Sequence, residues 1–465
     1  MKLSGVIVCA ASATLLASCS TLSTDANVSE ATAQSIPELP QTWAVDGALP
    51  GDVQIGWIAA IEDPVLTKLV QEAQANNPDI RAASASLDAA RALVRQARSA
   101  LFPQINASFE VDRSQSPQPF AINDVLYTGV VQADWEVDLW GRVRAGRNAA
   151  YASAQAVEAD LRFAQYSLAS GVAAAYFASI EASEQVGVAQ RTFDALAEID
   201  RIVRVRYREG FASRQDTAVT GADLEAARDS LAQAKNASRS AKRALEVLLG
   251  RYPASDMALR DELPEAPPPP PAGLPSQLLE RRPDVIAAER RVAAAFANVD
   301  AARAAKLPLV SLTANVGGAS TDLSQILNDG NIVWGLVGSL VQPVFNAGRL
   351  DAAVDEADAN QRAAIANYAS TALSALRDVE DNLDLVQVLA ERELILEKAA
   401  VESGTAYALS QLQYAEGEIA LIDVLNIQQR LFAAERNLVS IRRARVEQWI
   451  ALNLALGGNW DSAAQ

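Results

Sequence analysis

The chain has 465 residues and a formal net charge of −17, and 50% of its residues are hydrophobic although only 6% are aromatic. An acidic chain is the reverse of what a phosphate-binding surface needs, so we expect no nucleic-acid partner. Histidine is absent, which excludes imidazole-based acid–base catalysis, Ser-His-Asp nucleophiles and imidazole metal sites. Phosphate-loop and dinucleotide-binding glycine motifs are absent too. We therefore expect neither an enzyme nor a protein that uses a cofactor or metal.

The N-terminus has the pattern of an export signal. Met1 and Lys2 precede an apolar run that ends in Leu-Ala-Ser before Cys19. The run is too short for a permanent membrane helix, and residues 1–18 are predicted to be a signal peptide. Leu-Ala-Ser-Cys resembles the bacterial lipobox. This resemblance implies that Cys19 carries lipid, with palmitate among its acyl chains. Because no Asp follows Cys19, it also implies sorting to the outer membrane. The alternative is a plain signal peptide with an incidental cysteine.

One structural unit occurs twice in the sequence. The matching pairs are Pro78 and Pro283, Pro103 and Pro308, Gly141 and Gly348, Tyr207 and Tyr414, Gly210 and Gly417, Asp216 and Asp423, and Gly250 and Gly457. The offset is 205 positions at the two prolines and 207 afterwards. Near-constant spacing over so long a stretch indicates an internal two-fold repeat.

A proline-rich segment separates the two copies. Five consecutive prolines, residues 267–271, lie within it, and such a segment is a stiff, extended linker. The predicted organisation is listed in chain order: signal peptide 1–18, lipidated N-terminal extension 19–60, repeat 1 over 61–262, linker 263–275 and repeat 2 over 276–465.

Each repeat contains a long segment that favours helix. All 19 prolines lie outside residues 120–252 and 344–465, and these tracts are rich in strong helix formers. The tracts predict two long helical hairpins, over residues 141–250 and 348–457. An apolar seven-residue stripe in the first of them favours coiled-coil packing.

The predicted hairpins turn at matching glycines. Gly210 and Gly417 can adopt the left-handed conformation that ends a helix. Ser213 and Asp216 then form a candidate capping box for the returning helix of repeat 1. Repeat 2 has Ala420 where repeat 1 has Ser213, so its returning helix lacks that cap.

Period-two alternation precedes each hairpin. Residues 104–111 and 125–138 alternate apolar and polar side chains, residues 310–316 repeat the pattern, and residues 331–343 give a less clean fourth strand. We therefore expect strands at about 104–138 in repeat 1 and about 309–345 in repeat 2. Such strands fit a transmembrane barrel with a wet lumen, although a soluble hairpin packed on helices needs the same alternation. Four strands cannot close a barrel in lipid, so several chains would have to share one.

Three carboxylates alternate on the polar side of the second predicted strand. They are Asp134, Glu136 and Asp138. If the strands form a barrel, these acids line its lumen and, with the negative net charge, favour cations. They could equally form only the wet rim where the strand joins the helix.

At this point the sequence resembles, over nearly its whole mature length, the TolC-like outer-membrane efflux proteins, specifically the lipoprotein branch paired with resistance-nodulation-division pumps. The residues that carry the resemblance are the lipobox, Asp63-Pro64 with Asn77-Pro78-Asp79, Trp135 to Arg142 (WEVDLWGR), Leu278 to Asp284 (LLERRPD), Gln342 to Arg349 (QPVFNAGR) and Leu456-Gly457-Gly458. No single piece is specific, but the combination is.

The resemblance implies a mainly α fold with a β-barrel part. Three identical chains would share a twelve-stranded transmembrane barrel and an α-helical periplasmic tunnel, a homotrimer in contact with outer-membrane lipid and extending into the periplasm. Its implied function is passive conduction of drugs or other small molecules, which a periplasmic adaptor and an inner-membrane pump deliver. Two alternatives are a lipid-anchored periplasmic coiled-coil protein without a pore and a type I protein-secretion exit duct.

The resemblance also implies that the hairpin tips form the periplasmic gate and the adaptor-docking surface. The corresponding residues are Tyr207, Gly210, Asp216, Tyr414, Gly417 and Asp423. Purely structural roles are the alternative: the glycines would cap helices, the aspartates would be charges at helix starts, and the tyrosines would be packing residues.

Overall fold

The structure is a computed structural model that describes residues 24–46, 48–53, 56–113 and 125–460. The predicted signal peptide and Cys19 lie outside the described residues. The chain divides into two compact units: residues 86–158 and 287–371, with the described residues up to Pro37, form unit 1, and residues 38–85, 159–286 and 372–460 form unit 2. Each unit draws on both sequence repeats.

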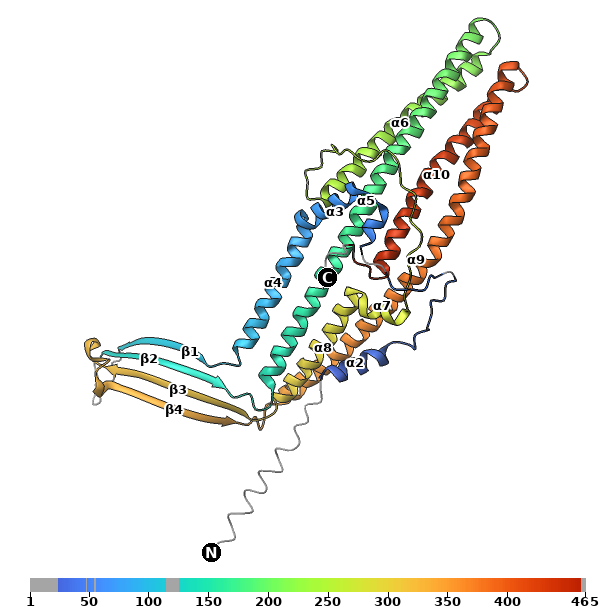
Figure 1. Ribbon diagram of the computed structural model, residues 1–465. Helices are drawn as coiled ribbons and strands as arrows, with labels where there is room; N and C mark the ends of the chain where they lie inside the picture. The colour runs from blue at the N-terminus through green and yellow to red at the C-terminus, as the bar shows by residue number, and fades with distance from the viewer. Residues whose placement is uncertain (1–23, 47, 54–55, 114–124, 461–465) are drawn as a thin grey trace. The chain divides into compact units, whose positions relative to one another are not determined.

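Unit 1 contains a four-stranded antiparallel sheet (Figure 1). Its strands are β1 (Gln104–Arg113), β2 (Val125–Glu136), β3 (Leu309–Ser320) and β4 (Ile332–Val341), hydrogen-bonded in the order β1-β2-β3-β4. The four predicted strands are confirmed. β2 ends at Glu136, two residues before the predicted limit at about residue 138.

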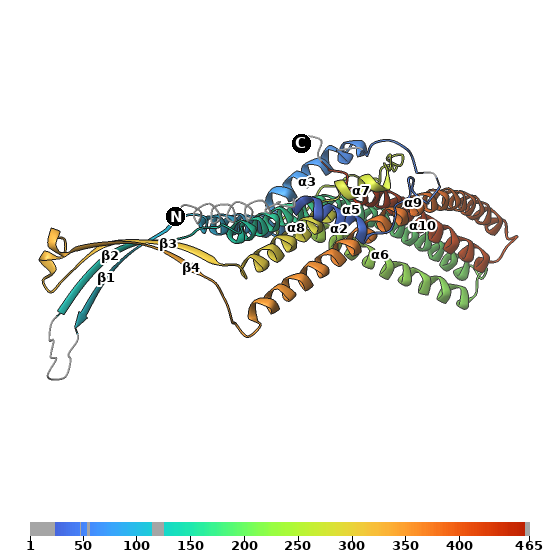
Figure 2. The same ribbon diagram turned by 90° about the horizontal axis from the view of Figure 1, so that it is seen from below.

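Four long helices form the two predicted hairpins. They are α5 (Arg142–Arg208), α6 (Arg214–Leu248), α9 (Arg349–Glu416) and α10 (Leu421–Ala455). α5 and α9 have 67 and 68 residues, lengths that are possible because no proline interrupts them. Within unit 2 both hairpin turns lie at the same end (Figures 1 and 2). Within the described residues, no helix is both long and apolar enough to cross a membrane.

The remaining helices are shorter. They are α2 (Thr24–Ser35), η1 (Trp57–Ile61), α3 (Pro64–Asn76), α4 (Pro78–Ser99), α7 (Pro275–Arg281), α8 (Pro283–Ala304), η2 (Leu323–Gln325) and η3 (Asp329–Asn331). Four of the α-helices begin at a proline. Proline suits the first helical position because the backbone N–H that it lacks would have no partner within the helix there.

The main core of unit 2 surrounds Tyr176 and Phe177 of α5, both fully buried. The buried Asp63 carboxylate caps α3 by accepting from Val65 N at 2.8 Å. The same carboxylate accepts from the Tyr176 hydroxyl at 2.9 Å. Burial and this acceptor raise the pKa of Tyr176, so the hydroxyl stays protonated and ties α5 to the start of α3.

Candidate functional site: a two-faced sheet and two hairpin tips

The cross-strand register collects apolar side chains on one face of the sheet. Ile105 pairs with Ala133, Ala133 with Ala314, and Ala314 with Leu336, across all four strands. Side chains two residues apart share a face. The apolar face therefore includes Ile105, Ala107, Phe109, Val111, Tyr127, Val131, Ala133, Trp135, Val310, Leu312, Ala314, Val316, Trp334, Leu336 and Leu340. A continuous apolar surface of this kind marks a membrane or protein contact.

The opposite face is mostly polar across the first three strands, with Leu126 and Val130 of β2 as apolar exceptions. Asn106 pairs with Gln132, which pairs with Asn315. Asp134, one of the predicted lumen residues, lies on this face and accepts from the Thr313 hydroxyl at 2.9 Å. In β4 the alternation fails, because Val333, Val337 and Val341 occupy the polar side.

Glu136 lies on the same face as Asp134, at the end of β2, whereas Asp138 lies beyond the strand. Glu136, the last residue of β2, pairs with Arg142, whose Nε donates to it at 2.9 Å. Asp138 lies beyond the strand and caps α5 by accepting from Val143 N at 3.0 Å and Arg144 N at 2.9 Å. Burial opposes ionisation of Asp138, but the hydrogen bonds from Arg144 and Val143 outweigh it and lower the pKa. Asp138 therefore holds the junction between strand and helix.

The two hairpin tips have the same backbone. Gly210 and Gly417 adopt φ angles of 84° and 80°. In the first tip Phe211 N donates to Arg206 O at 2.7 Å, and in the second Glu418 N donates to Gln413 O at 2.9 Å. This pattern is the Schellman motif, in which a left-handed glycine closes the helix end.

The returning helices are capped differently. Ser213 Oγ accepts from Asp216 N at 3.1 Å, and Ser213 N donates to the Asp216 carboxylate at 2.8 Å, which completes the predicted capping box. In the second tip Ala420 has no side-chain acceptor. Only the reciprocal bond remains there, from Ala420 N to the Asp423 carboxylate at 3.3 Å.

The matching tyrosines lie in different surroundings. Tyr207 is 46% exposed, whereas Tyr414 is half-buried. The Arg206 guanidinium lies over the Tyr414 ring, 4.6 Å from its centroid, an arrangement that stabilises a cation against the ring face. Tyr414 therefore joins the two hairpins, a contact that the sequence did not predict.

A buried ionic group in the first hairpin was also missed. Asp200 is buried and accepts from Arg204 Nε at 2.5 Å and from the buried Thr220 hydroxyl at 3.0 Å. These bonds join α5 to α6 close to the tip. The spacing of Asp200 and Arg204 by four residues was the available signal.

The tips also differ in charge. The first carries both signs of charge: its arginines are at 201, 204, 206, 208 and 214 and its acids at 198, 200, 209 and 216. Residues 399–429, around the second, contain Glu402, Glu416, Glu418 and Asp423 but no lysine or arginine. A tip with charges of both signs thus contacts an acidic tip within the same chain, through Arg206 and Tyr414.

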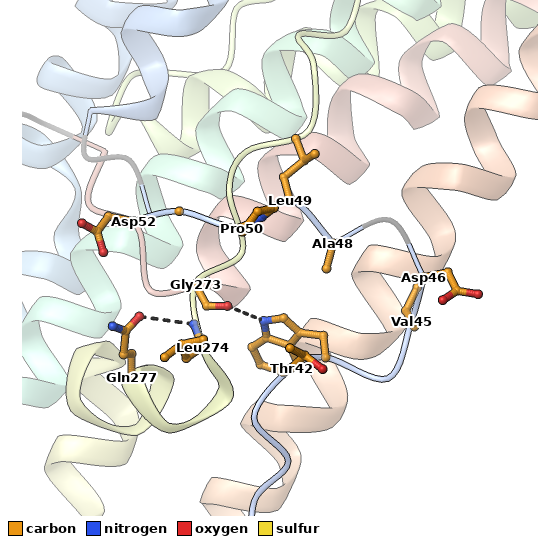
Figure 3. A pocket seen from close by; sticks show the side chains of 12 residues that line it. Thr42, Val45, Asp46, Ala48, Leu49, Pro50, Asp52, Gly273, Leu274 and Gln277 are labelled. Carbon is orange, nitrogen blue, oxygen red and sulfur yellow. Dashed lines mark hydrogen bonds between the residues drawn. The ribbon is translucent and has the colours of Figure 1, made fainter.

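An N-terminal segment over the described residues between 42 and 52 borders a pocket of about 330 Å³ with Gly273, Leu274 and Gln277 (Figure 3). The Trp43 indole donates to Gly273 O at 3.1 Å. The backbone N–H groups of Ala44 and Val45 donate to the Glu380 carboxylate at 2.8 and 3.1 Å. The Trp43 bond joins the segment to the residues before α7, and the two bonds to Glu380 join it to α9.

Paired long helical hairpins with a sheet that is apolar on one face and polar on the other define a class of outer-membrane channel proteins. The family model described as "Outer membrane efflux protein" matches residues 69–251 and 274–458. The chain belongs to this family, and it is an outer-membrane channel for efflux.

Relatives and solved structures agree with this assignment. The solvent efflux pump outer membrane protein SrpC of Pseudomonas putida is 32% identical over 419 residues, which cover 86% of each chain. The structure of the outer-membrane channel OprN superposes with a TM-score of 0.83 at 28% identity and covers 91% of this chain and 99% of that one. The open state of the Neisseria gonorrhoeae MtrE channel gives a TM-score of 0.80 at 30% identity, covering 92% and 98%.

Proposed function

We propose that three copies of this chain form the outer-membrane duct of a tripartite efflux pump. The register that gathers apolar side chains on one face of the sheet carries the proposal. β1 and β4 are the sheet's two edges, and an open edge is not tolerated in lipid. Three copies joined edge to edge would close the sheet with its apolar face toward lipid and Asp134 toward the lumen.

Native mass spectrometry of the purified protein in detergent tests this assembly. We expect a trimer, and a heat-sensitive oligomer band on a gel. A protein that is monomeric under conditions that keep it folded would overturn the proposal.

The transport step is passive. An inner-membrane pump and a periplasmic adaptor supply substrate and energy, and the duct conducts drugs or other small molecules without catalysing a reaction. Support comes from the membership in a transport family and from a sequence without histidine.

A lipid on Cys19 would tether the trimer to the membrane. The lipobox supports this, and mass spectrometry of the mature N-terminus tests it. Cys19→Ala should impair sorting while the barrel still inserts, because the shared strands bury far more apolar area than acyl chains do. An unmodified N-terminus at any other residue would refute the lipidation.

The hairpin tips would form the closed periplasmic gate and dock the adaptor. In a trimer the acidic second tips would repel one another unless arginines of the first tips lay beside them, so the closure would be poised to open. Replacing Asp216 and Asp423 together by Ala should increase leak of a bulky antibiotic into cells and leave the trimer intact. A double variant that behaves like the parent would place the gate elsewhere.

A further inference from the structure

The loop that joins β3 to β4, residues 321–331, has an ordered internal structure. The Asp322 carboxylate accepts from Ser324 N at 2.9 Å and from the Ser324 hydroxyl at 2.8 Å. Asn331 Nδ2 donates to Gln325 O at 2.8 Å. These bonds give the loop a defined conformation of its own.

Two glycines create the surface on which this loop rests. Gly129 of β2 and Gly318 of β3 are paired across the sheet. A side chain on Gly318 would collide with the carbonyl oxygen of Ile326, and a Cβ on Gly129 would lie 3.6 Å from Ile326 Cδ1. The loop thus packs into a notch that only glycines leave open.

The notch lies on the apolar face of the sheet. By strand alternation, side chains at 129 and 318 would point to the same face as Val131 and Val316. A Cβ on Gly129 would also lie 3.8 Å from Phe109, which belongs to that face. The loop consequently folds toward the apolar face and away from the row that contains Asp134.

The loop adds its own apolar side chains to this surface. Leu323 is 52% exposed and Leu327 is 79% exposed. Both lie at the end of the sheet opposite the one where β2 leads into α5 and β4 leads into α9. An apolar surface that extends the lipid-facing side of a barrel favours contact with acyl chains.

We infer that residues 321–331 are a lipid-contact segment, with Leu323 and Leu327 in the acyl boundary of the outer leaflet and not at the pore mouth. This inference rests on the proposed function, because it takes the apolar face as the lipid-facing one. It assigns the loop a membrane role independent of the gate.

Site-directed spin labelling in liposomes tests the inference. The sequence has two cysteines, Cys9 and Cys19, so a single new cysteine gives a clean label in a background that carries both Cys9→Ala and Cys19→Ala. Leu327→Cys is the test position. Its controls are Val316→Cys on the apolar face and the neighbouring Asn315→Cys on the polar face. Collision rates with oxygen, which enriches in lipid, and with a polar nickel chelate distinguish the two environments.

We expect the label at 327 to favour oxygen over nickel, as at 316, and the label at 315 to show the reverse. A label at 327 that behaves like the one at 315, while 316 contacts lipid, would overturn the loop inference and leave the barrel proposal intact. A label at 327 that neither reagent reaches would also overturn it, by showing a protein neighbour. If 316 does not contact lipid, both proposals fail.

A second variant tests the notch itself. Gly318→Val should displace Ile326 and shift the label at 327 toward nickel accessibility, whereas Gly330→Val, at a position with open space around it, should not. An unchanged label in Gly318→Val would contradict the anchoring.

Discussion

The two hairpin tips share a backbone and differ in almost every side chain that surrounds it. Both turn at a left-handed glycine with the same closing hydrogen bonds. The first is joined internally by Asp200, Arg204 and Thr220. At the corresponding level of the second, Tyr407 and Phe432 make an aromatic contact, with ring centroids 6.4 Å apart. The repeat has thus kept the geometry of the turn and changed the chemistry that it presents.

This difference suggests separate roles for the tips. The first has a complete cap and a buried ionic group, so we expect it to be the more rigid. The second is acidic, has half a cap, and contacts the first through Tyr414 and Arg206. It is therefore the better candidate for the part that moves.

The largest effect should come from the glycines that the tips share. Gly210→Val and Gly417→Val should each destabilise the local hairpin by roughly 1–2 kcal/mol, because a β-branched residue is strained at positive φ. Hydrogen exchange of the helix ends on both sides of each turn measures this. Gly187→Ala, inside α5 with room for a methyl group, should instead stabilise its helix. If valine destabilises one tip but not the other, the two turns do not have equivalent backbones.

The caps should respond in opposite directions. Ser213→Ala removes the side-chain acceptor and should destabilise the start of α6 by about 1 kcal/mol. Ala420→Ser supplies the missing acceptor and should stabilise the start of α10 by up to about 1 kcal/mol. Exchange protection of the first turn of each helix provides the comparison. Equal responses in the same direction would contradict the asymmetry between the caps.

The contact between the hairpins should contribute a smaller free energy than the caps do. Arg206→Ala removes the cation over the Tyr414 ring and should destabilise the second tip by about 0.5–1 kcal/mol. Arg208→Ala, an exposed arginine two residues away, is the matched control and should leave exchange in residues 411–424 unchanged. If both variants have the same effect, the cause is the general loss of positive charge.

The smallest effect should be the pH response of the first tip. The backbone N–H and hydroxyl of Ser213 lower the pKa of Asp216. A carboxyl with a lowered folded-state pKa stabilises the fold above its unfolded value of about 3.9 and loses that contribution as the pH falls through the folded value. A spin label at Phe211→Cys should therefore become more mobile only below about pH 4. Asp216→Asn should abolish the response, and a response that survives this change would assign it to another group.

Local patterns were sufficient to predict much of this molecule. Alternation predicted the strands, the absence of proline predicted the long helices, and Gly210, Gly417 and Ser213 predicted how those helices end and begin. These features depend on residues close together in the sequence, so their physics is visible there.

The features that the sequence does not predict depend on where the chain leaves the sheet or on contacts between residues far apart in the sequence. Asp138 continues the alternation of β2, but the chain leaves the sheet after Glu136, so its carboxylate meets α5. Tyr414 and Arg206 come from different hairpins, and no local pattern pairs them. The alternation of the predicted fourth strand is less regular because β4 is apolar on both faces.

The central claim, which rests on the proposed function, is that three copies of this chain form a pore whose resting closure lies at the hairpin tips. The most direct test records single channels of the purified protein in a planar bilayer across a salt gradient, with the parent and the Asp216→Ala, Asp423→Ala variant side by side. We predict stepwise currents with larger steps in the variant than in the parent. We also predict a reversal potential that indicates cation preference, because Asp134 lies on the polar face and the formal net charge is −17. Folded, inserted protein that gives no current steps, or a pore with anion preference and identical steps in both proteins, would contradict the account.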